Sequence, residues 1–147
     1  MDTLQQFMAY AGDFERTYAD DDWSRLRAHF ADDAIYDVRG SFGCTLVGPT
    51  AIFTGMKKSL DNFDRRFTAR DIAVTSGPEV DGAELRVGWQ VTYTKEGLPP
   101  FVLRGRSTVR CANGVIVYLS DSFEPEVAGE LADWQRRTGV AIDPSYA

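Results

Sequence analysis

The feature that most constrains the fold is a change in the spacing of apolar residues near Arg66. Before this point, apolar side chains recur at steps of three and four, which is the spacing of one face of an α-helix. After it, apolar and polar residues alternate, most clearly from Leu85 to Tyr93, as they do in a half-buried β-strand. Helices followed by a run of strands predict an α+β fold.

Three helices are expected before residue 66. The first begins at a cap formed by Asp2 or Thr3, a short second helix follows the cap residue Asp22, and the third begins at Pro49 or Thr50. The apolar stripes on these helices are Leu4, Phe7, Met8, Ala11, Phe14 and Tyr18, then Trp23, Leu26 and Phe30, and then Ile52, Phe53, Met56 and Leu60. These stripes give each helix one face to pack on a sheet.

Turn signals divide the rest of the chain into strands. Asp81-Gly82 is a hairpin signal, Gly97 to Pro100 forms the next turn, and Asn113-Gly114 closes another strand. The expected strands cover residues 34–39, 42–46, 67–76, 84–93, 101–111 and 115–123, and a last helix covers residues 126–138. Antiparallel strands of this length twist, so we expect one domain over residues 1–147. It is expected to be a cystatin-like cone, in which N-terminal helices pack on a strongly curved antiparallel sheet that encloses an apolar pocket.

Composition excludes several functional classes. The net charge of −6, without a basic stripe, disfavours nucleic acid as a partner. Residues 1–18 lack the basic and apolar blocks of a signal peptide, and no apolar run reaches membrane-spanning length, so we expect a cytoplasmic protein without a membrane partner. Cys44 and Cys111 have no metal-site spacing, and their apolar neighbours suit a reducing compartment better than a disulfide.

The order of elements and three local motifs resemble the nuclear transport factor two-like superfamily. Within it, the chain is most similar to the SnoaL-like polyketide cyclase and ketosteroid isomerase-like branch. The motifs are Trp23-x-x-Leu26-x-x-x-Phe30-Ala-Asp-Asp-Ala34 running into Ile35-Tyr36-Asp37, Gly48-Pro49-x-Ala51-Ile52, and Asn113-Gly114-Val115-Ile116-Val117 leading to Asp121. The resemblance implies a conical pocket for a small apolar molecule, a homodimer formed through the sheet, no cofactor, and, in the enzymes, a pocket carboxylate that moves a proton or activates a water.

Asp121 is the first candidate for a catalytic residue. It alternates in register with four apolar residues of the last expected strand, Val115, Val117, Leu119 and Phe123. Its side chain is therefore expected on the apolar face, where burial raises the pKa of an unpaired carboxyl group toward the range of an acid or base near neutrality. The resemblance also implies a catalytic aspartate in this strand. The alternative is a hydrated, inert carboxylate at a frayed strand end near Glu124-Pro125.

Asp37 is the second catalytic candidate, because it lies close to the position of the proton-shuttling aspartate in the ketosteroid isomerase-like enzymes. The match is off by one residue, which would turn the side chain to the other face, and an ion pair with Arg39 is the alternative. Seven further side chains are expected to bind the substrate in the pocket. They are Tyr18, Trp23, Tyr36, Phe63, Trp89, Tyr93 and Ser107.

The chain departs from the enzymes that it resembles. Phe14 stands where the isomerases carry an oxyanion-hole tyrosine, with Tyr18 one turn later as a substitute, and Ser107 falls near their protonated aspartate. The Arg-x-Asp of the epoxide hydrolases reads Arg86-Val87-Gly88. The only histidine, His29, is expected at the surface, and no ligand cluster predicts a metal site.

These observations favour a cofactor-independent isomerase, cyclase or dehydratase that acts by acid/base catalysis. Its substrate would be a small apolar carbonyl compound of polyketide or steroid character, with Tyr18, Tyr36 and Ser107 donating hydrogen bonds to a developing oxyanion. The competing hypothesis is a non-catalytic small-molecule-binding or dimerisation module. Arg104, Arg106 and Arg110 share one strand face, which suits an exposed or dimer-forming surface or, if that face is concave, an anion clamp.

Overall fold

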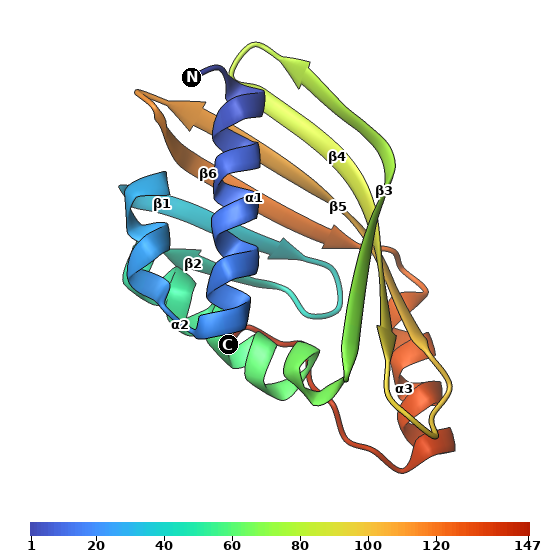
Figure 1. Cartoon of the computed structure of the whole chain (residues 1–147). Coiled ribbons are helices and arrows are strands. Elements are labelled where there is room, and N and C mark those ends of the chain that lie inside the picture. The colour runs from blue at the N-terminus through green and yellow to red at the C-terminus, as the bar shows by residue number, and fades with distance from the viewer.

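The computed structural model describes residues 1–147 as a six-stranded sheet with helix α1 crossing one of its faces (Figure 1). The helices are α1 (Thr3–Asp20), α2 (Pro49–Asn62) and α3 (Val127–Thr138), together with the short 3₁₀ helices η1 (Trp23–His29) and η2 (Asp64–Arg66). The strands are β1 (Phe30–Arg39), β2 (Cys44–Val47), β3 (Ala69–Asp81), β4 (Glu84–Thr94), β5 (Phe101–Ala112) and β6 (Val115–Phe123). We call the face covered by α1 the inner face and the opposite face the outer face.

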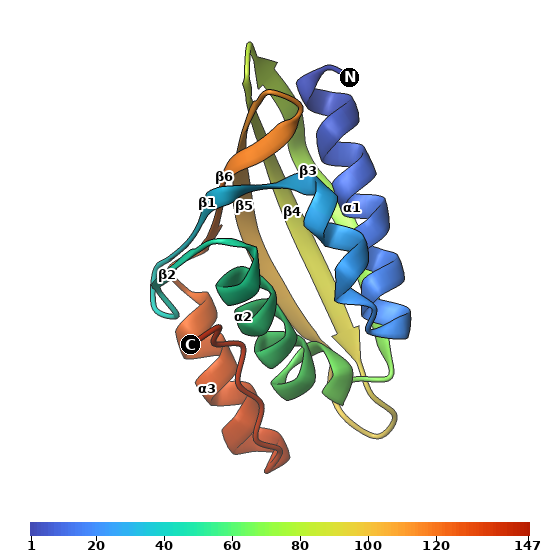
Figure 2. The same ribbon diagram turned by 90° about the vertical axis from the view of Figure 1, so that its left-hand side faces the viewer.

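The sheet is mixed, with the strand order β2-β1-β6-β5-β4-β3. The strands β3 to β6 pair antiparallel in chain order, as the hairpin signals predict, and β2 pairs antiparallel with β1. The pair β1–β6 is parallel, which corrects the expected all-antiparallel sheet. No hairpin joins these two distant segments, so no turn requires them to run in opposite directions. Figure 2 shows the sheet from the side, with α1 and the strands as separate layers.

Helix α1 is capped as predicted, and its packed face keeps Phe7, Ala11 and Phe14 of the predicted stripe. The Asp2 side chain accepts a hydrogen bond of 2.8 Å from the backbone N–H of Gln5. Leu4 and Met8, expected on the packed face, are exposed. The buried positions are Thr3, Tyr10 and Thr17, flanked by Phe7 and Phe14. The two threonines can be buried because their hydroxyls donate to the backbone carbonyls of Gly82 and Asp22.

A bulge in β6 changes which residues face inward. The expected alternation placed Val115 and Val117 on the inner face, but the pairing of β5 with β6 shifts between Arg110 and Cys111. One extra residue of β6 is accommodated there, and Ile116 enters the core instead. Beyond the bulge the expected inner face is kept by Leu119, Asp121 and Phe123.

Two apolar clusters form the core. The larger cluster joins α1, η1 and α2 to the inner residues of β1, β5 and β6. The smaller cluster joins α3, Phe63 and Phe67 to residues 91–93 of β4 and 101–103 of β5. Residues 142–146 run back along α2, where the carbonyl of Pro144 accepts a hydrogen bond of 2.7 Å from Ser59 Oγ. The clusters meet at Trp89 and Phe123, which pack against both.

Cys44 and Cys111 are both free thiols. None of the helices combines the length and the apolar character that crossing a bilayer requires.

Candidate functional site

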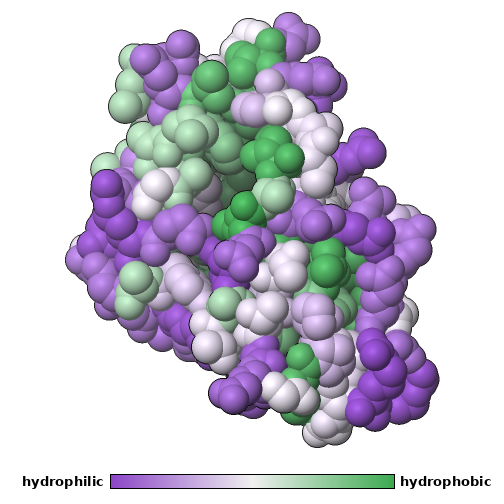
Figure 3. Space-filling view, turned by 45° about the vertical axis from the view of Figure 1, so that its right-hand side comes forward, coloured by the Kyte–Doolittle hydropathy of each residue, from purple (hydrophilic) through white to green (hydrophobic).

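A cavity of about 360 Å³ lies between α1, α2 and the inner face of the sheet. Of its 26 lining residues, 19 are hydrophobic, so the cavity suits an apolar ligand. Met8 of α1 and Ile72 and Val74 of β3 belong to this lining, yet they are 58%, 49% and 59% exposed, which marks them as the rim of the opening. Figure 3 shows hydrophobic residues gathered around a hollow on this side of the molecule.

Asp121 lies in the wall of this cavity, and both of its carboxyl oxygens accept a hydrogen bond. The phenol of Tyr36 donates to Oδ2 at 2.5 Å, and Ser107 Oγ donates to Oδ1, also at 2.5 Å. Trp89 Nε1 in turn donates to Ser107 Oγ at 2.8 Å, which orients that hydroxyl. Burial raises the pKa of Asp121, while the hydrogen bonds from Ser107 and Tyr36 oppose this rise. No cationic side chain bonds the carboxyl group, so its proton affinity is set by burial and hydrogen bonding.

Strand register brings these four side chains together. Asp121 of β6 is paired directly with Ser107 of β5, and Tyr36 lies two residues before Val38, which is the partner of Asp121 on β1. Trp89 of β4 is paired with Gly105, where an added Cβ would meet Cζ2 and Cη2 of the indole at 2.8 Å. The absence of a side chain at residue 105 therefore leaves room for the indole to lie across β5 and reach Ser107.

Two tyrosines that the sequence did not single out also line the cavity. Tyr10 of α1 is buried, and its pKa is raised by burial and, next in size, by the charge of Asp121. Tyr146 packs edge-on against Tyr36 with ring centroids 5.3 Å apart, and burial raises its pKa as well. Both phenols stay protonated and are neutral hydrogen-bond donors near the carboxyl group.

A second polar group lies at another part of the cavity wall. The Arg70 guanidinium contacts Asp64 Oδ2 at 2.9 Å and Glu15 at 2.8 Å, and Tyr93 donates to the same Asp64 oxygen at 2.8 Å. Burial raises the pKa of Asp64, and the charge of Arg70 opposes that shift. The mostly apolar lining therefore contains two polar groups. One is Asp64, which is ion-paired with Arg70, and the other is the carboxyl group of Asp121, which has no cationic partner.

The structure brings together six of the residues expected in the site. The cavity is lined by all six, which are Tyr36, Phe63, Trp89, Tyr93, Ser107 and Asp121. Phe63 and Tyr93 are packed edge-to-face with ring centroids 4.8 Å apart. The roles of all six in catalysis or binding stay predictions.

Three expected site residues lie outside the cavity. Asp37 points to the outer face, where it accepts hydrogen bonds from Tyr118 and Arg39, because strand alternation separates it from Tyr36. The guanidinium of Arg70 lies over the Tyr18 ring, 5.0 Å from its centroid, and Tyr18 is not part of the cavity lining. Trp23 packs between Phe14 and Phe53, and its Nε1 donates to Asp21.

A model of the SnoaL-like domain matches residues 11–119 of the chain. The chain belongs to the SnoaL-like domain family. The resemblance drawn from the sequence motifs is thereby confirmed, although the matched range of this SnoaL-like protein ends two residues before Asp121.

Solved structures show the same α+β cone, which confirms the predicted fold class. A protein with a ketosteroid isomerase-like fold from Catenulispora acidiphila, in complex with trimethylamine, has a TM-score of 0.64 at 20% identity, covering 90% of this chain and 93% of that one. An NTF2-like protein from Burkholderia pseudomallei has a TM-score of 0.67 at 16% sequence identity, and the match covers 92% of this chain and 96% of that one. An LEH-like epoxide hydrolase from M. tuberculosis has a TM-score of 0.62 at 14% sequence identity, and the match covers 90% of this chain and 93% of that one. No curated protein sequence matches the chain.

Proposed function

We propose that this SnoaL-like protein is a cofactor-independent enzyme in which Asp121 moves a proton on a small apolar carbonyl compound. The observation that carries the proposal is the position of the Asp121 carboxyl group, in the wall of a mostly hydrophobic cavity and without a cationic partner. Burial raises its pKa, which gives a base that is stronger than an exposed carboxylate. Nothing in the polar lining requires a cofactor for such a step.

The proposed step is the removal of a proton from a carbon next to a carbonyl group. The ionised Asp121 takes the proton, the electron pair of the C–H bond forms a C=C bond, and the carbonyl oxygen becomes an enolate oxygen. Asp121, now protonated, returns the proton to another carbon in an isomerisation. In a cyclisation, the enolate carbon attacks a second carbonyl carbon, and Asp121 protonates the resulting alkoxide.

The enolate oxygen needs a hydrogen-bond donor in the cavity. Tyr36 and Ser107 already donate to Asp121, so they hold the base rather than the oxyanion. Tyr10 fits the second role, because its phenol lies in the cavity lining within electrostatic reach of Asp121. This assignment replaces the expected contribution of Tyr18, which lies outside the cavity.

A test of the proposal does not require the natural substrate. Proton abstraction next to a carbonyl exchanges that hydrogen for deuterium in D₂O, which NMR detects directly for any bound apolar ketone or 1,3-diketone. We expect the wild-type protein to catalyse this exchange and Asp121→Asn to lose at least about a hundredfold of the rate, the usual contribution of a general base. Asp37→Asn is the matched control, because it makes the same change on the outer face.

The outcomes separate catalysis from binding. Bound ketone without exchange in the wild-type protein would support the non-catalytic binding module, in which Asp121 serves only as a hydrogen-bond acceptor. Equal exchange rates in the Asp121→Asn and wild-type proteins would rule out Asp121 as the base. Saturation-transfer NMR on the same samples reports whether each variant still binds the ketone.

A further inference from the structure

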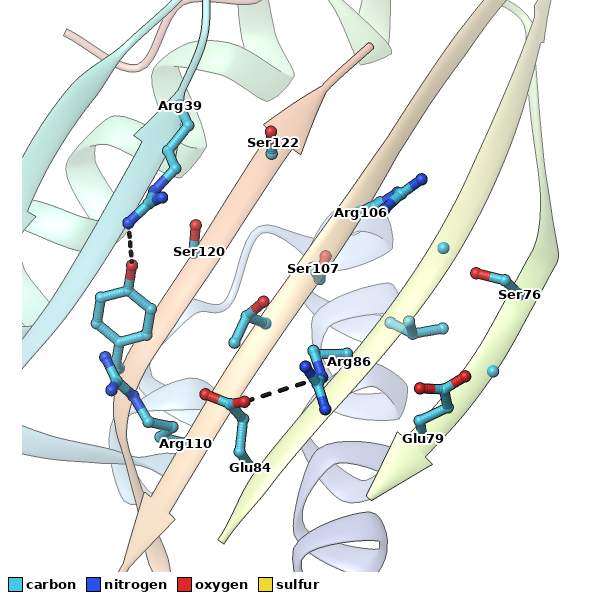
Figure 4. A pocket seen from close by; sticks show the side chains of 15 residues that line it. Arg39, Ser76, Glu79, Glu84, Arg86, Arg106, Ser107, Arg110, Ser120 and Ser122 are labelled. Atoms are coloured by element: carbon cyan, nitrogen blue, oxygen red, sulfur yellow. Dashed lines mark hydrogen bonds and ion pairs between the residues drawn. The ribbon is translucent and has the colours of Figure 1, made fainter. Parts of the chain in front are cut away.

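The arginines of the sheet are divided between its two faces. Figure 4 shows four of them on the outer face, which are Arg39, Arg86, Arg106 and Arg110. Arg70 of β3 is the only cationic residue in the lining of the inner cavity. A cation in a mostly apolar wall is costly unless its hydrogen-bonding capacity is used. The contacts of Arg70 therefore show what this residue leaves available to a ligand.

The guanidinium group of Arg70 is held on three sides. Nε donates to Asp64 Oδ2 at 2.9 Å, and Nη1 donates to the two carboxylate oxygens of Glu15 at 2.8 and 2.9 Å. Tyr18 covers one face of the group. Nη2, which carries two N–H groups, forms no hydrogen bond within the chain. The only sealed side-chain polar atom without a partner is Gln6 Oε1, so Nη2 is accessible rather than enclosed in the core.

The charges around Arg70 favour a neutral ligand group. One guanidinium faces two carboxylates, Asp64 and Glu15, so the group carries an excess of negative charge and repels an anion. A cationic ligand group cannot accept a hydrogen bond from Nη2. A hydroxyl group satisfies both sides, because it accepts from Nη2 and donates to Glu15, whose side chain is 48% exposed.

Strand β4 relates the Arg70 group to Asp121. Tyr93 is the cross-strand partner of Arg70, and Trp89 belongs to the hydrogen-bond network of Asp121. Tyr93 and Trp89 are four residues apart on the inner face of β4, which is about 13 Å along the strand. Val91 lies between them in the cavity lining. The cavity therefore presents two polar groups that are separated by apolar wall.

Two phenols show that both polar groups belong to one compartment. Burial raises the pKa of Tyr10, and so do the charges of Asp121 and Glu15. Burial raises the pKa of Tyr146 as well, together with the charges of Asp121 and Asp64. Each phenol thus lies within electrostatic reach of both ends of the cavity. A ligand that fills the space beside these phenols can contact both polar groups at once.

We propose that the cavity binds a ketone with a neutral oxygen group at its far end, and that Arg70 and Glu15 bind this second group. The ketone carbonyl lies at Asp121, so the inference names the substrate class of the proposed function and rests on it. Arg70 takes no part in the proton transfer. Its role is to determine specificity, because it selects a hydroxylated ketone over a ketone with an apolar end.

A series of ketones tests the proposal, with isothermal titration calorimetry as the measurement of affinity. The probes are 2-octanone, 2-decanone and 2-dodecanone, each unsubstituted or with a hydroxyl, a carboxylate or a trimethylammonium group on the last carbon. At one chain length, we expect the hydroxyl to raise the affinity of the wild-type protein at least about tenfold over the unsubstituted ketone, as a hydrogen bond to a charged group does. The carboxylate should lower the affinity.

Three variants assign the effect to residues. Arg70→Lys should remove most of the gain from the hydroxyl, because an ammonium group paired with Asp64 lacks the second arm of the guanidinium. Arg65→Lys is the matched control, since Arg65 also lies over the Tyr18 ring, 5.7 Å from its centroid, but is not part of the cavity lining. Glu15→Gln removes one negative charge and keeps the Arg70–Asp64 pair, so it should bind the carboxylate derivative more tightly than the wild type does. Thermal unfolding shows which variants keep the fold.

Three results would overturn the proposal. They are no gain from the hydroxyl at any chain length, an equal gain in the wild-type and Arg70→Lys proteins, and tighter binding of a charged derivative than of the hydroxyl derivative. The deuterium-exchange rates of the same ketones are measured separately. Exchange without a gain from the hydroxyl would refute this inference alone. A gain from the hydroxyl without exchange would refute the acid/base role of Asp121 and leave the second polar site in place.

Discussion

The phenol of Tyr36 donates a hydrogen bond of 2.5 Å to Asp121 Oδ2 although 85 positions separate the two residues in the sequence. The parallel pairing of β1 with β6 creates this contact, because it places both residues on the inner face of adjacent strands. A hydrogen bond to the ionised form of a carboxyl group favours that form. Tyr36 therefore limits how far burial raises the pKa of Asp121.

We predict that Tyr36→Phe moves the acid limb of the deuterium-exchange rate to higher pH. The change removes a donor that stabilises the carboxylate, so the pKa of Asp121 rises further and less of it is ionised at a given pH. On the acid limb, the rate should fall roughly tenfold at constant pH, as expected for one hydrogen bond to a charged group. The measurement is the exchange rate as a function of pH.

Tyr118→Phe is the control for this prediction, since Tyr118 donates a hydrogen bond of 2.8 Å to Asp37 on the outer face. Its profile should coincide with that of the wild type. A Tyr36→Phe profile that also coincides with the wild type would show that Tyr36 does not control the ionisation of the base.

We also predict that Asp121 makes the folded state less stable as pH rises. Its pKa is higher in the folded than in the unfolded chain, so the folded state holds the proton more tightly. The free energy of unfolding therefore decreases from the ordinary carboxyl pKa, about 3.9, up to the raised pKa, and is level above it. Asp121→Asn cannot ionise and should lose this part of the slope. Urea unfolding at a series of pH values measures both slopes.

The difference between the two proteins is the informative quantity, because Asp64 also has a raised pKa and contributes equally to both. If the wild-type and Asp121→Asn slopes are the same over this window, the carboxyl group titrates as it does in the unfolded chain, and the assigned burial effect is wrong.

A third prediction concerns the position that admits the Trp89 indole. Gly105→Ala places a methyl group 2.8 Å from the indole carbons and 2.7 Å from the carbonyl oxygen of Ser122. The indole must move, which breaks its hydrogen bond to Ser107, and the free energy of unfolding should fall by about 1–3 kcal/mol. Chemical denaturation measures the loss, and near-UV circular dichroism reports the displaced indole.

Gly129→Ala makes the same chemical change where an added methyl group has no neighbour within 4 Å, in the first turn of α3. It should raise the free energy of unfolding by up to about 0.5–1 kcal/mol through helix propensity, the full difference being that of a helix interior. A Gly105→Ala protein as stable as the wild type would mean that β5 can accommodate the methyl group without moving the indole.

Much of the sheet is predictable because strand alternation is a local signal. The inner residues of β4, from Leu85 to Tyr93, and the inward direction of Asp121 both follow from counting by two along the sequence. The same counting fails at Val115 and Val117, because the bulge that shifts them depends on the pairing with β5. Asp37 shows that an error of one position is enough to assign a residue to the wrong face, since its neighbour Tyr36 points inward.

The rest of the site depends on packing between distant segments. Tyr10 lies outside the stripe that the sequence predicts for α1, because the packed face includes its phenol and two threonines, which apolar spacing does not mark. Tyr146 gave no local signal, because its place against Tyr36 depends on how residues 142–146 lie on α2.

The path of residues 142–146 along α2 makes the cavity sensitive to a cut in a segment that lies outside the sheet. Gly55 has room for no side chain, because an added Cβ would lie 2.8 Å from the carbonyl oxygen of Tyr146, so this segment sits directly on the helix. Pro144 and Tyr146 are part of the cavity wall, although they lie more than twenty residues beyond Asp121 in the sequence. Proteolysis ahead of Pro144 would therefore remove part of the wall and the ring that packs on Tyr36, while the strand that carries Asp121 stayed whole.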